Sequence, residues 1–176
     1  MTKAMLHRIR QVKREIRTLG VAAGERRTGG GFEIVGVVYR GNSLLDGVMR
    51  NVASGPDLTS DIAEMVLSSS HHEQIRVLIL KHPLAGGVAS LNALRLSSSV
   101  SKPVLILSFS PIPPYTGEGI SFQLINIRGT GLNVASIGLK RRETEMIIKM
   151  ASQPDEGVPE CVRVADLILD SLAECD

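Results

Sequence analysis

Two short apolar runs constrain the fold of this chain more than any other feature. Val77–Leu80 reads Val-Leu-Ile-Leu, and Val104–Leu107 repeats the same four residues. Continuous apolar runs of this length are typical of strands that are covered on both faces, as in a parallel sheet. The segment Val88–Leu96 between them predicts a helix. The order strand, helix, strand therefore predicts a right-handed crossover between two parallel strands.

The residues before these runs predict an antiparallel meander. Phe32–Tyr39 is rich in β-branched residues and predicts a strong strand, and Arg40–Ser43 predicts a turn into a further strand at Leu44–Val52. Arg17–Val21 predicts a shorter strand, which the loop Gly24–Gly31 folds back against the next one. Hairpin geometry makes all three strands antiparallel.

Helical periodicity predicts the next element and several later ones. Leu58, Ile62, Met65 and Val66 recur at helical spacing in Asp57–Leu67, with Asp57 or Thr59 as the cap. Further elements are predicted as follows: strands at Ser121–Ile127 and Asn133–Leu139, a helix at Glu143–Ala151 and a last helix opening at Gly157–Glu160. The chain is thus predicted to be α/β, with a mixed sheet in which three antiparallel strands precede parallel strands with flanking helices.

Length and composition favour one globular domain over residues 1–176. The chain is 43% hydrophobic, which supplies a core, but only 3% aromatic. No apolar run is long enough to span a bilayer, and the basic segment 1–20 lacks the apolar stretch of a secretory signal. The two cysteines, Cys161 and Cys175, are too few for a disulfide framework. We expect a cytoplasmic protein with no membrane partner.

The positive charge is concentrated at the amino terminus. Residues 1–27 hold eight basic and two acidic residues, so they carry +6, and the remainder carries −4 to give the net +2. A basic segment of this kind is suited to contact with phosphates of DNA or RNA, and it is equally consistent with a solvated arm. The candidate nucleic-acid contacts are Arg8, Arg10, Lys13, Arg14 and Arg17. The sequence does not set the oligomeric state.

Several segments, taken together and in order, resemble one known family. They are Arg14–Gly20, Val35–Gly41, Leu45–Val48, Asp57–Thr59, Ile62–Met65, Gln74–Leu80, Val158–Glu160 and Arg163–Ile168. This set resembles the archaeal endonuclease dU family, long described as an uncharacterised protein family and distantly similar to endonuclease V. The resemblance implies a ribonuclease H-like, endonuclease V-like fold, and it covers nearly the whole chain.

The same resemblance shows where this chain departs from the family. In the family, the first strand runs into Gly-Ile-Asp-Asp-Gly and a later buried strand ends Leu-Asp-Gly, and these acids resemble the metal ligands of ribonuclease H-like nucleases. Here Ala22 and Ala23 stand in place of the acid pair, and Lys81 and His82 stand in place of Asp-Gly. The acid at the start of the helix remains as Asp57.

These departures conflict with what the chemistry needs. Metal-dependent phosphodiester hydrolysis uses Mg²⁺, a hard ion that takes oxygen ligands, and alanine offers none. Lys81 would add a positive charge, and each unit-charge repulsion at about 4 Å and an effective dielectric constant of about 20 costs about 4 kcal/mol. Lys81 could instead bind an anion directly, or simply reach solvent at the end of its strand.

We therefore expect a degenerate family member that binds nucleic acid without metal-dependent nuclease activity and needs no cofactor. Asp57 is the remaining candidate catalytic acid, although a helix cap explains it as well. Two alternatives stay open. One is an active Mg²⁺-dependent endonuclease on DNA with deaminated bases, in which Asp57, with Asp61 or Glu64 contributing, supplies the ligands. The other is a non-enzymatic anion-binding or assembly protein.

Overall fold

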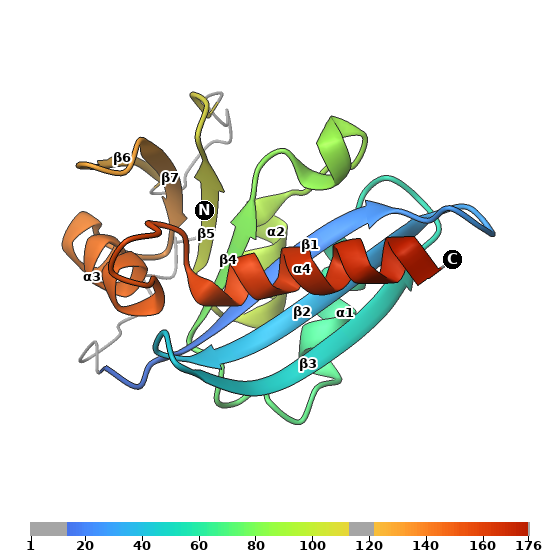
Figure 1. Cartoon of the computed structure of the whole chain (residues 1–176), viewed down its shortest axis with the longest axis horizontal. Coiled ribbons are helices and arrows are strands. Elements are labelled where there is room, and N and C mark those ends of the chain that lie inside the picture. Colours follow the sequence, from blue (N-terminus) through green and yellow to red (C-terminus); the bar gives the residue numbers. More distant parts are fainter. Residues whose placement is uncertain (1–13, 113–121, 176) are drawn as a thin grey trace.

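A seven-stranded sheet with helices on both faces forms the protein (Figure 1). The structure is a computed structural model that describes residues 14–112 and 122–175. The strands are β1 (Arg17–Glu25), β2 (Phe32–Arg40), β3 (Leu44–Ala53), β4 (Val77–Lys81), β5 (Val104–Ser108), β6 (Phe122–Ile127) and β7 (Leu132–Ile137). The helices are α1 (Thr59–Leu67), the short 3₁₀ turn η1 (Leu84–Gly87), α2 (Ala93–Val100), α3 (Arg141–Ala151) and α4 (Glu160–Cys175).

Strand order in the sheet is β3-β2-β1-β4-β5-β7-β6. The pairs β1–β2 and β2–β3 are antiparallel, whereas β1–β4 and β4–β5 are parallel. β7 returns antiparallel to β5, and β6 is antiparallel to β7 at the far edge. The predicted meander of three strands, the parallel crossover and the mixed α/β sheet are therefore confirmed.

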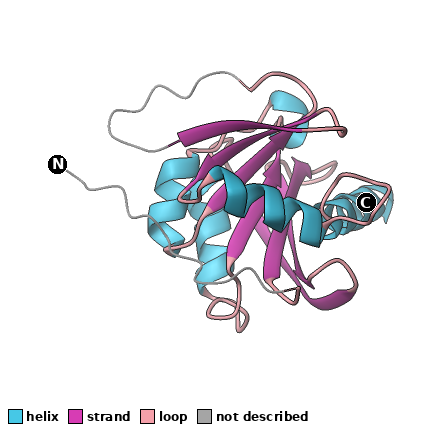
Figure 2. Cartoon of the chain, turned by 90° about the vertical axis from the view of Figure 1, so that its left-hand side faces the viewer, coloured by secondary structure: helices cyan, strands magenta, loops and turns pink. Residues whose placement is uncertain are grey.

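Each face of the sheet is covered by its own pair of helices (Figure 2). Alternation along β4 shows how the faces divide, because Leu78 and Leu80 pack with α1 and α2, whereas Val77 and Ile79 pack with α3 and α4. All four side chains are fully buried. The apolar run was predicted for this reason, since a strand covered on both faces has no solvent side to make polar.

Helix α4 crosses the sheet over β1 and β2, as Figure 1 shows. The approach is closest at Gly20, where an added Cβ would lie 2.2 Å from the backbone carbon of Cys161. Beside this contact, the Thr18 hydroxyl donates to the Cys161 sulfur across 3.3 Å. Cys161 is fully buried, and this burial raises the pKa of its thiol to about 12.

Boundaries differ from the sequence prediction mainly around α2. A helix was predicted at Val88–Leu96, but α2 begins at Ala93, because the Asn92 side chain caps it by accepting from the N–H of Arg95. The preceding η1 turn contains Ala85 and Gly86 at positive φ, which a continuous helix excludes. Within the described ranges, no helix combines the length and apolar character needed to span a bilayer.

We predict that Gly20→Ala lowers the free energy of unfolding by about 1–3 kcal/mol, because the new methyl group cannot be accommodated without moving α4 away from β1. Urea unfolding followed by circular dichroism measures this change. Gly55→Ala is the matched control, since nothing lies within 4 Å of its added Cβ. Equal midpoints for the two variants would contradict the close contact.

Candidate functional site

The parallel pairing of β1 with β4 brings the two predicted site positions together. The last paired residues are Val21 and Leu80, so Ala22 and Lys81 are the next residues along the two adjacent strands. Both lie at the carboxyl end of parallel strands, where α/β proteins commonly place ligands. The β1–β4 register therefore places Ala22 beside Lys81 at adjacent strand ends.

The two alanines, however, face opposite sides of the sheet. Ala22 packs with Val35, Val37 and Ala165 beneath α4, whereas Ala23 belongs to the core shared with α1 and α2. Strand alternation requires this, because consecutive side chains point to opposite faces. Only Ala22 therefore shares a face with Lys81, and an acid at position 23 would project away from that site.

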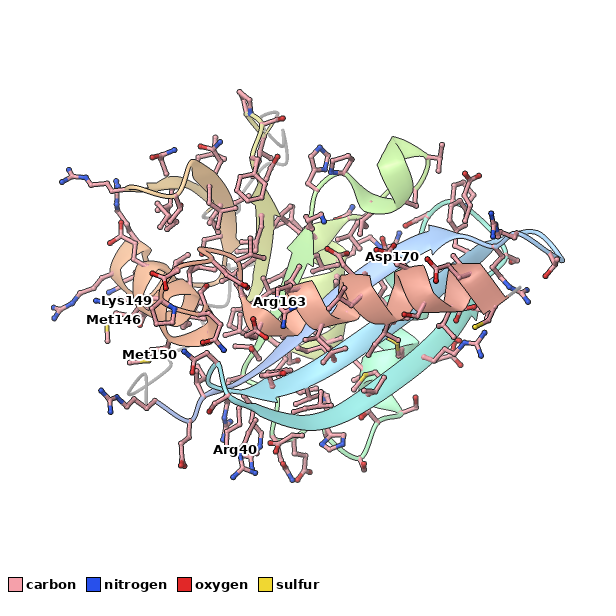
Figure 3. All side chains as sticks on the ribbon, in the orientation of Figure 1. Arg40, Met146, Lys149, Met150, Arg163 and Asp170 are labelled. Carbon is pink, nitrogen blue, oxygen red and sulfur yellow. The ribbon has the colours of Figure 1, made fainter. Side chains whose placement is uncertain are left out.

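Lys81 makes an ion pair that the sequence did not predict. Its Nζ lies 2.6 Å from Oδ2 of Asp166 on α4, with side-chain exposures of 47% and 33%. Asp166 follows Ala165, which packs with Ala22, so the Lys81–Asp166 ion pair lies beside this packed cluster under α4. Figure 3 labels Arg163 and Asp170 on the same helix. His82, the next residue of the chain, donates its backbone N–H to the carbonyl of Leu107 across 2.7 Å.

Asp57 belongs to the α1–α2 side of the molecule. Its Oδ1 accepts from the N–H of Thr59 across 3.1 Å and from the Thr59 hydroxyl across 2.5 Å. The carboxylate also lies 3.8 Å from the guanidinium of Arg95 on α2. The hydrogen bonds from the Thr59 side chain and backbone lower the pKa of Asp57 below 3.8. Leu58 rather than Asp57 is the N-cap residue, so Asp57 fixes the turn that leads into α1.

The residues at this site do not fit a divalent cation. Mg²⁺ needs several oxygen ligands, and the carboxyl ends of β1 and β4 supply Ala22 and Lys81. The carboxylate of Asp166 lies next to these strand ends, but its charge is already neutralised by the ion pair with Lys81. Across residues 14–112 and 122–175, no group of three or more His, Cys, Asp or Glu side chains is arranged to hold a metal ion.

The candidate nucleic-acid contacts at the amino terminus lie partly outside the described residues. Arg8, Arg10 and Lys13 precede residue 14, where the described part of the chain begins. Arg14 is exposed, and Arg17 begins β1, at the opposite end of this strand from Ala22. The structure therefore does not bring Arg17 and Lys81 together into one site.

Arg17 is also engaged in an ion pair. Its Nε lies 2.7 Å from Oδ2 of Asp46, and Arg40 contacts the same carboxylate at 3.0 Å. Burial alone would raise the pKa of Asp46, yet the hydrogen bonds from Arg40 and Arg17 hold it below its ordinary value. Arg17 thus has a structural role in the sheet in addition to any ligand contact.

Solved structures with the same arrangement define the class of fold. A protein of unknown function from Archaeoglobus fulgidus superposes with a TM-score of 0.75 and 20% identity, covering 89% of this chain and 97% of that one. Endonuclease V from Bacillus subtilis superposes with a TM-score of 0.63 and 14% identity, covering 91% and 81%. Endonuclease V from Ciona intestinalis, solved in complex with a 23mer DNA containing an inosine, superposes with a TM-score of 0.64 and 8% identity, covering 91% of this chain and 86% of that one. The fold is therefore ribonuclease H-like, of the endonuclease V type.

Sequence comparison identifies the family. The pattern of the Endonuclease dU family matches residues 14–113, more than half of the chain. A UPF0215 protein of Methanosarcina mazei is 31% identical over 184 residues, covering 89% of this chain and 90% of that one. One from Methanothermobacter thermautotrophicus is 37% identical over 105 residues, covering 57% of this chain and about half, 52%, of that one. The chain belongs to the Endonuclease dU family, as its segments predicted.

We predict that Asp57→Ala destabilises the protein by about 1 kcal/mol at pH 7, since the Thr59 N–H loses its acceptor. Asp57→Asn keeps an acceptor and serves as the matched control. Because the folded pKa of Asp57 is lowered, its charge-dependent contribution is complete above pH 3.8 and is lost as pH falls through the folded value. Thermal unfolding between pH 2 and 7 measures the difference. A loss that depends on added Mg²⁺ would instead identify Asp57 as a ligand.

Proposed function

We propose that this protein binds nucleic acid and does not hydrolyse it with a metal ion. The observation that carries the proposal is the Lys81–Asp166 ion pair beside Ala22, at the strand ends where the family's acids would lie. A divalent cation there would meet an ammonium group and an already neutralised carboxylate. At about 4 Å and an effective dielectric constant of about 20, the repulsion between Lys81 and a dication is about 8 kcal/mol, twice that of a single charge.

The remaining acids do not compensate. Asp57 is turned toward Thr59 and Arg95 on the α1–α2 side, and Asp61 and Glu64 lie on α1 on that same side. Lys81 and Asp166 lie on the α4 side. A two-ion or one-ion nuclease site needs its carboxylates to converge on one point. The sheet therefore separates Asp166 from Asp57, Asp61 and Glu64.

Nucleic acid is the ligand that family and fold favour. The family's pattern is that of Endonuclease dU, and endonuclease V of Ciona intestinalis, which shares this fold, was solved with bound DNA. A scaffold that lacks metal ligands can still hold a phosphate backbone by positive charge alone. We therefore propose DNA or RNA as the partner, held by basic residues and released by salt.

Cleavage assays test the enzymatic half of this proposal. Duplex DNA containing deoxyuridine or deoxyinosine, incubated with the pure protein and Mg²⁺ or Mn²⁺, should remain intact. Cleavage by the wild-type protein that Asp57→Ala or Asp166→Asn abolishes would overturn the proposal, because it would show that the acids do assemble a metal site. Asp61→Asn would then show whether α1 contributes ligands.

Metal binding gives a separate prediction. We expect millimolar Mn²⁺ to leave the melting temperature of the wild-type protein unchanged, since the carboxylate of Asp166 is already ion-paired with Lys81. The variant Ala22→Asp/Lys81→Asp places two new carboxylates next to Asp166, and its melting temperature should rise with Mn²⁺. Differential scanning fluorimetry measures both, with Ca²⁺-free buffer plus chelator as the control. If Mn²⁺ raised the melting temperature of the wild-type protein as much as that of the variant, the conclusion that the wild-type residues do not bind a divalent cation would be wrong.

A further inference from the structure

Four basic residues stand in register at the amino end of the sheet. Arg40 and Arg17 are directly paired between β2 and β1. Thr18 pairs with Val77, so Arg17 lies beside Arg76, whose N–H donates to the Arg17 carbonyl across 2.9 Å. Leu78 pairs with Val104 and donates its N–H to the Pro103 carbonyl across 3.0 Å, which brings Arg76 and Lys102 to the same end of β4 and β5. Arg40 on β2, Arg17 on β1, Arg76 just before β4 and Lys102 just before β5 are here called the basic row.

Strand alternation puts the side chains of Arg40 and Arg17 on the same face, where both contact Asp46. Each is two residues from an apolar residue of the core beneath α1 and α2, and these residues are Val38 and Leu19. Side chains two positions apart along a strand share a face. Arg17 and Arg40 therefore continue the α1–α2 face beyond its apolar core, and Arg76 and Lys102 lie just before the first residues of the next two strands, at the same end of the sheet. Figure 3 labels Arg40 at the end of β2.

The row is only partly neutralised. Asp46 is shared between Arg17 and Arg40, which leaves one positive charge on that trio. Arg76 and Lys102 make no ion pair with any residue of the described ranges, and Arg76 is exposed. Burial and the charge of Arg76 lower the pKa of Lys102, whereas the more weakly acting Glu73 raises it. Burial is the main cause of this shift, and the charge of Arg76 adds to it, which shows that Lys102 and Arg76 lie close enough to interact.

We propose that the basic row is a docking surface for the phosphate backbone of nucleic acid, with Arg76 and Lys102 as its main contacts. Adjacent strands are about 4.8 Å apart, so the row is about 14 Å long. Over that length one strand of duplex DNA presents about four phosphates. The basic amino-terminal segment enters the described structure at Arg14, whose carbonyl oxygen lies 2.6 Å from the Cβ position of Gly41 next to Arg40. Arg14 and the basic row therefore lie at the same end of the molecule.

This surface is separate from the strand ends at which the family's acids would lie. Ala22 and Lys81 are at the carboxyl ends of β1 and β4, whereas Arg17 and Arg76 are at their amino ends. The inference rests on the proposed function, because it names the surface that performs the binding. It differs in location from any contact centred on Lys81.

The test compares two doubly substituted proteins with equal loss of charge. Arg76→Gln/Lys102→Gln removes the two unpaired cations of the row. Arg27→Gln/Arg95→Gln removes two exposed cations at the opposite, carboxyl end, where Arg27 contacts the Ala173 carbonyl and Arg95 contacts Asp57. Binding of a labelled DNA duplex of about 20 base pairs is followed by fluorescence anisotropy from low to moderate salt. Circular dichroism confirms that both variants are folded.

We expect the row variant to bind about tenfold more weakly at low salt, and its slope of log affinity against log salt to fall by about 2. The carboxyl-end variant should bind like the wild type, and Arg76→Lys/Lys102→Arg should keep wild-type affinity because it keeps both charges. If the wild type binds and both glutamine variants lose affinity equally, or only the carboxyl-end variant does, the docking surface is wrong and the proposed function stands. If the wild type fails to bind at low salt, both are overturned.

Discussion

The parallel pairing of β1 with β4 is the contact on which the two proposed sites of the molecule depend. One register, Thr18 with Val77 through Val21 with Leu80, places Ala22 beside Lys81 at one end. The same register places Arg17 beside Arg76 at the other. A slip by one residue would exchange the faces of every side chain on one strand and separate both pairs. The buried run Val77–Leu80 prevents such a slip, because both of its faces are packed.

Charge decides what each end of this pairing can hold. At the carboxyl end, a lysine and an aspartate cancel each other, and the ion pair is exposed enough that its contribution to stability is only about 0–1 kcal/mol. Stabilisation of the fold is therefore a poor explanation for a lysine at this position. At the amino end, the cations exceed the carboxylates that contact them. The first end is poorly suited to a divalent cation, and the second is suited to a polyanion.

Much of the fold could be predicted from local patterns, and the errors have physical causes. The meander and the two buried strands follow from periodicity and β-branched composition, which depend on neighbours in sequence. The start of α2 was placed too early, because the apolar residues around Val88 are held in a 3₁₀ turn rather than a helix. Alternation within the hairpin gives no signal that Glu33 is buried, yet it is 6% exposed and pairs with Arg50. The sequence did not show that α4 covers this face of the hairpin.

The candidate site was predicted less completely, because its contacts join distant parts of the chain. The positions Ala22 and Lys81 could be found from the resemblance, but Asp166 lies 85 residues from Lys81 and has no local signal beyond its place on the last helix. The basic row was also hidden, since its members look like scattered surface charges until the strand register aligns them. Of the two candidate nucleic-acid contacts that the structure describes, Arg14 and Arg17, the second belongs to the row, where its spatial neighbour Arg76 is 59 residues away in sequence.

Under the proposed function, a scaffold of the endonuclease V type that lacks carboxylates at Ala22 and Lys81 would retain features that bind a phosphate backbone. Hydrolysis needs carboxylates converging within a few ångströms, so a single change such as an aspartate to lysine can remove it. Backbone binding needs only several cations at fixed spacing, and it tolerates the loss of any one. The sheet register supplies that spacing here without any metal. The proposed loss of the metal site is therefore compatible with the proposed binding, because the cations that would carry the binding lie at the other end of the same strands.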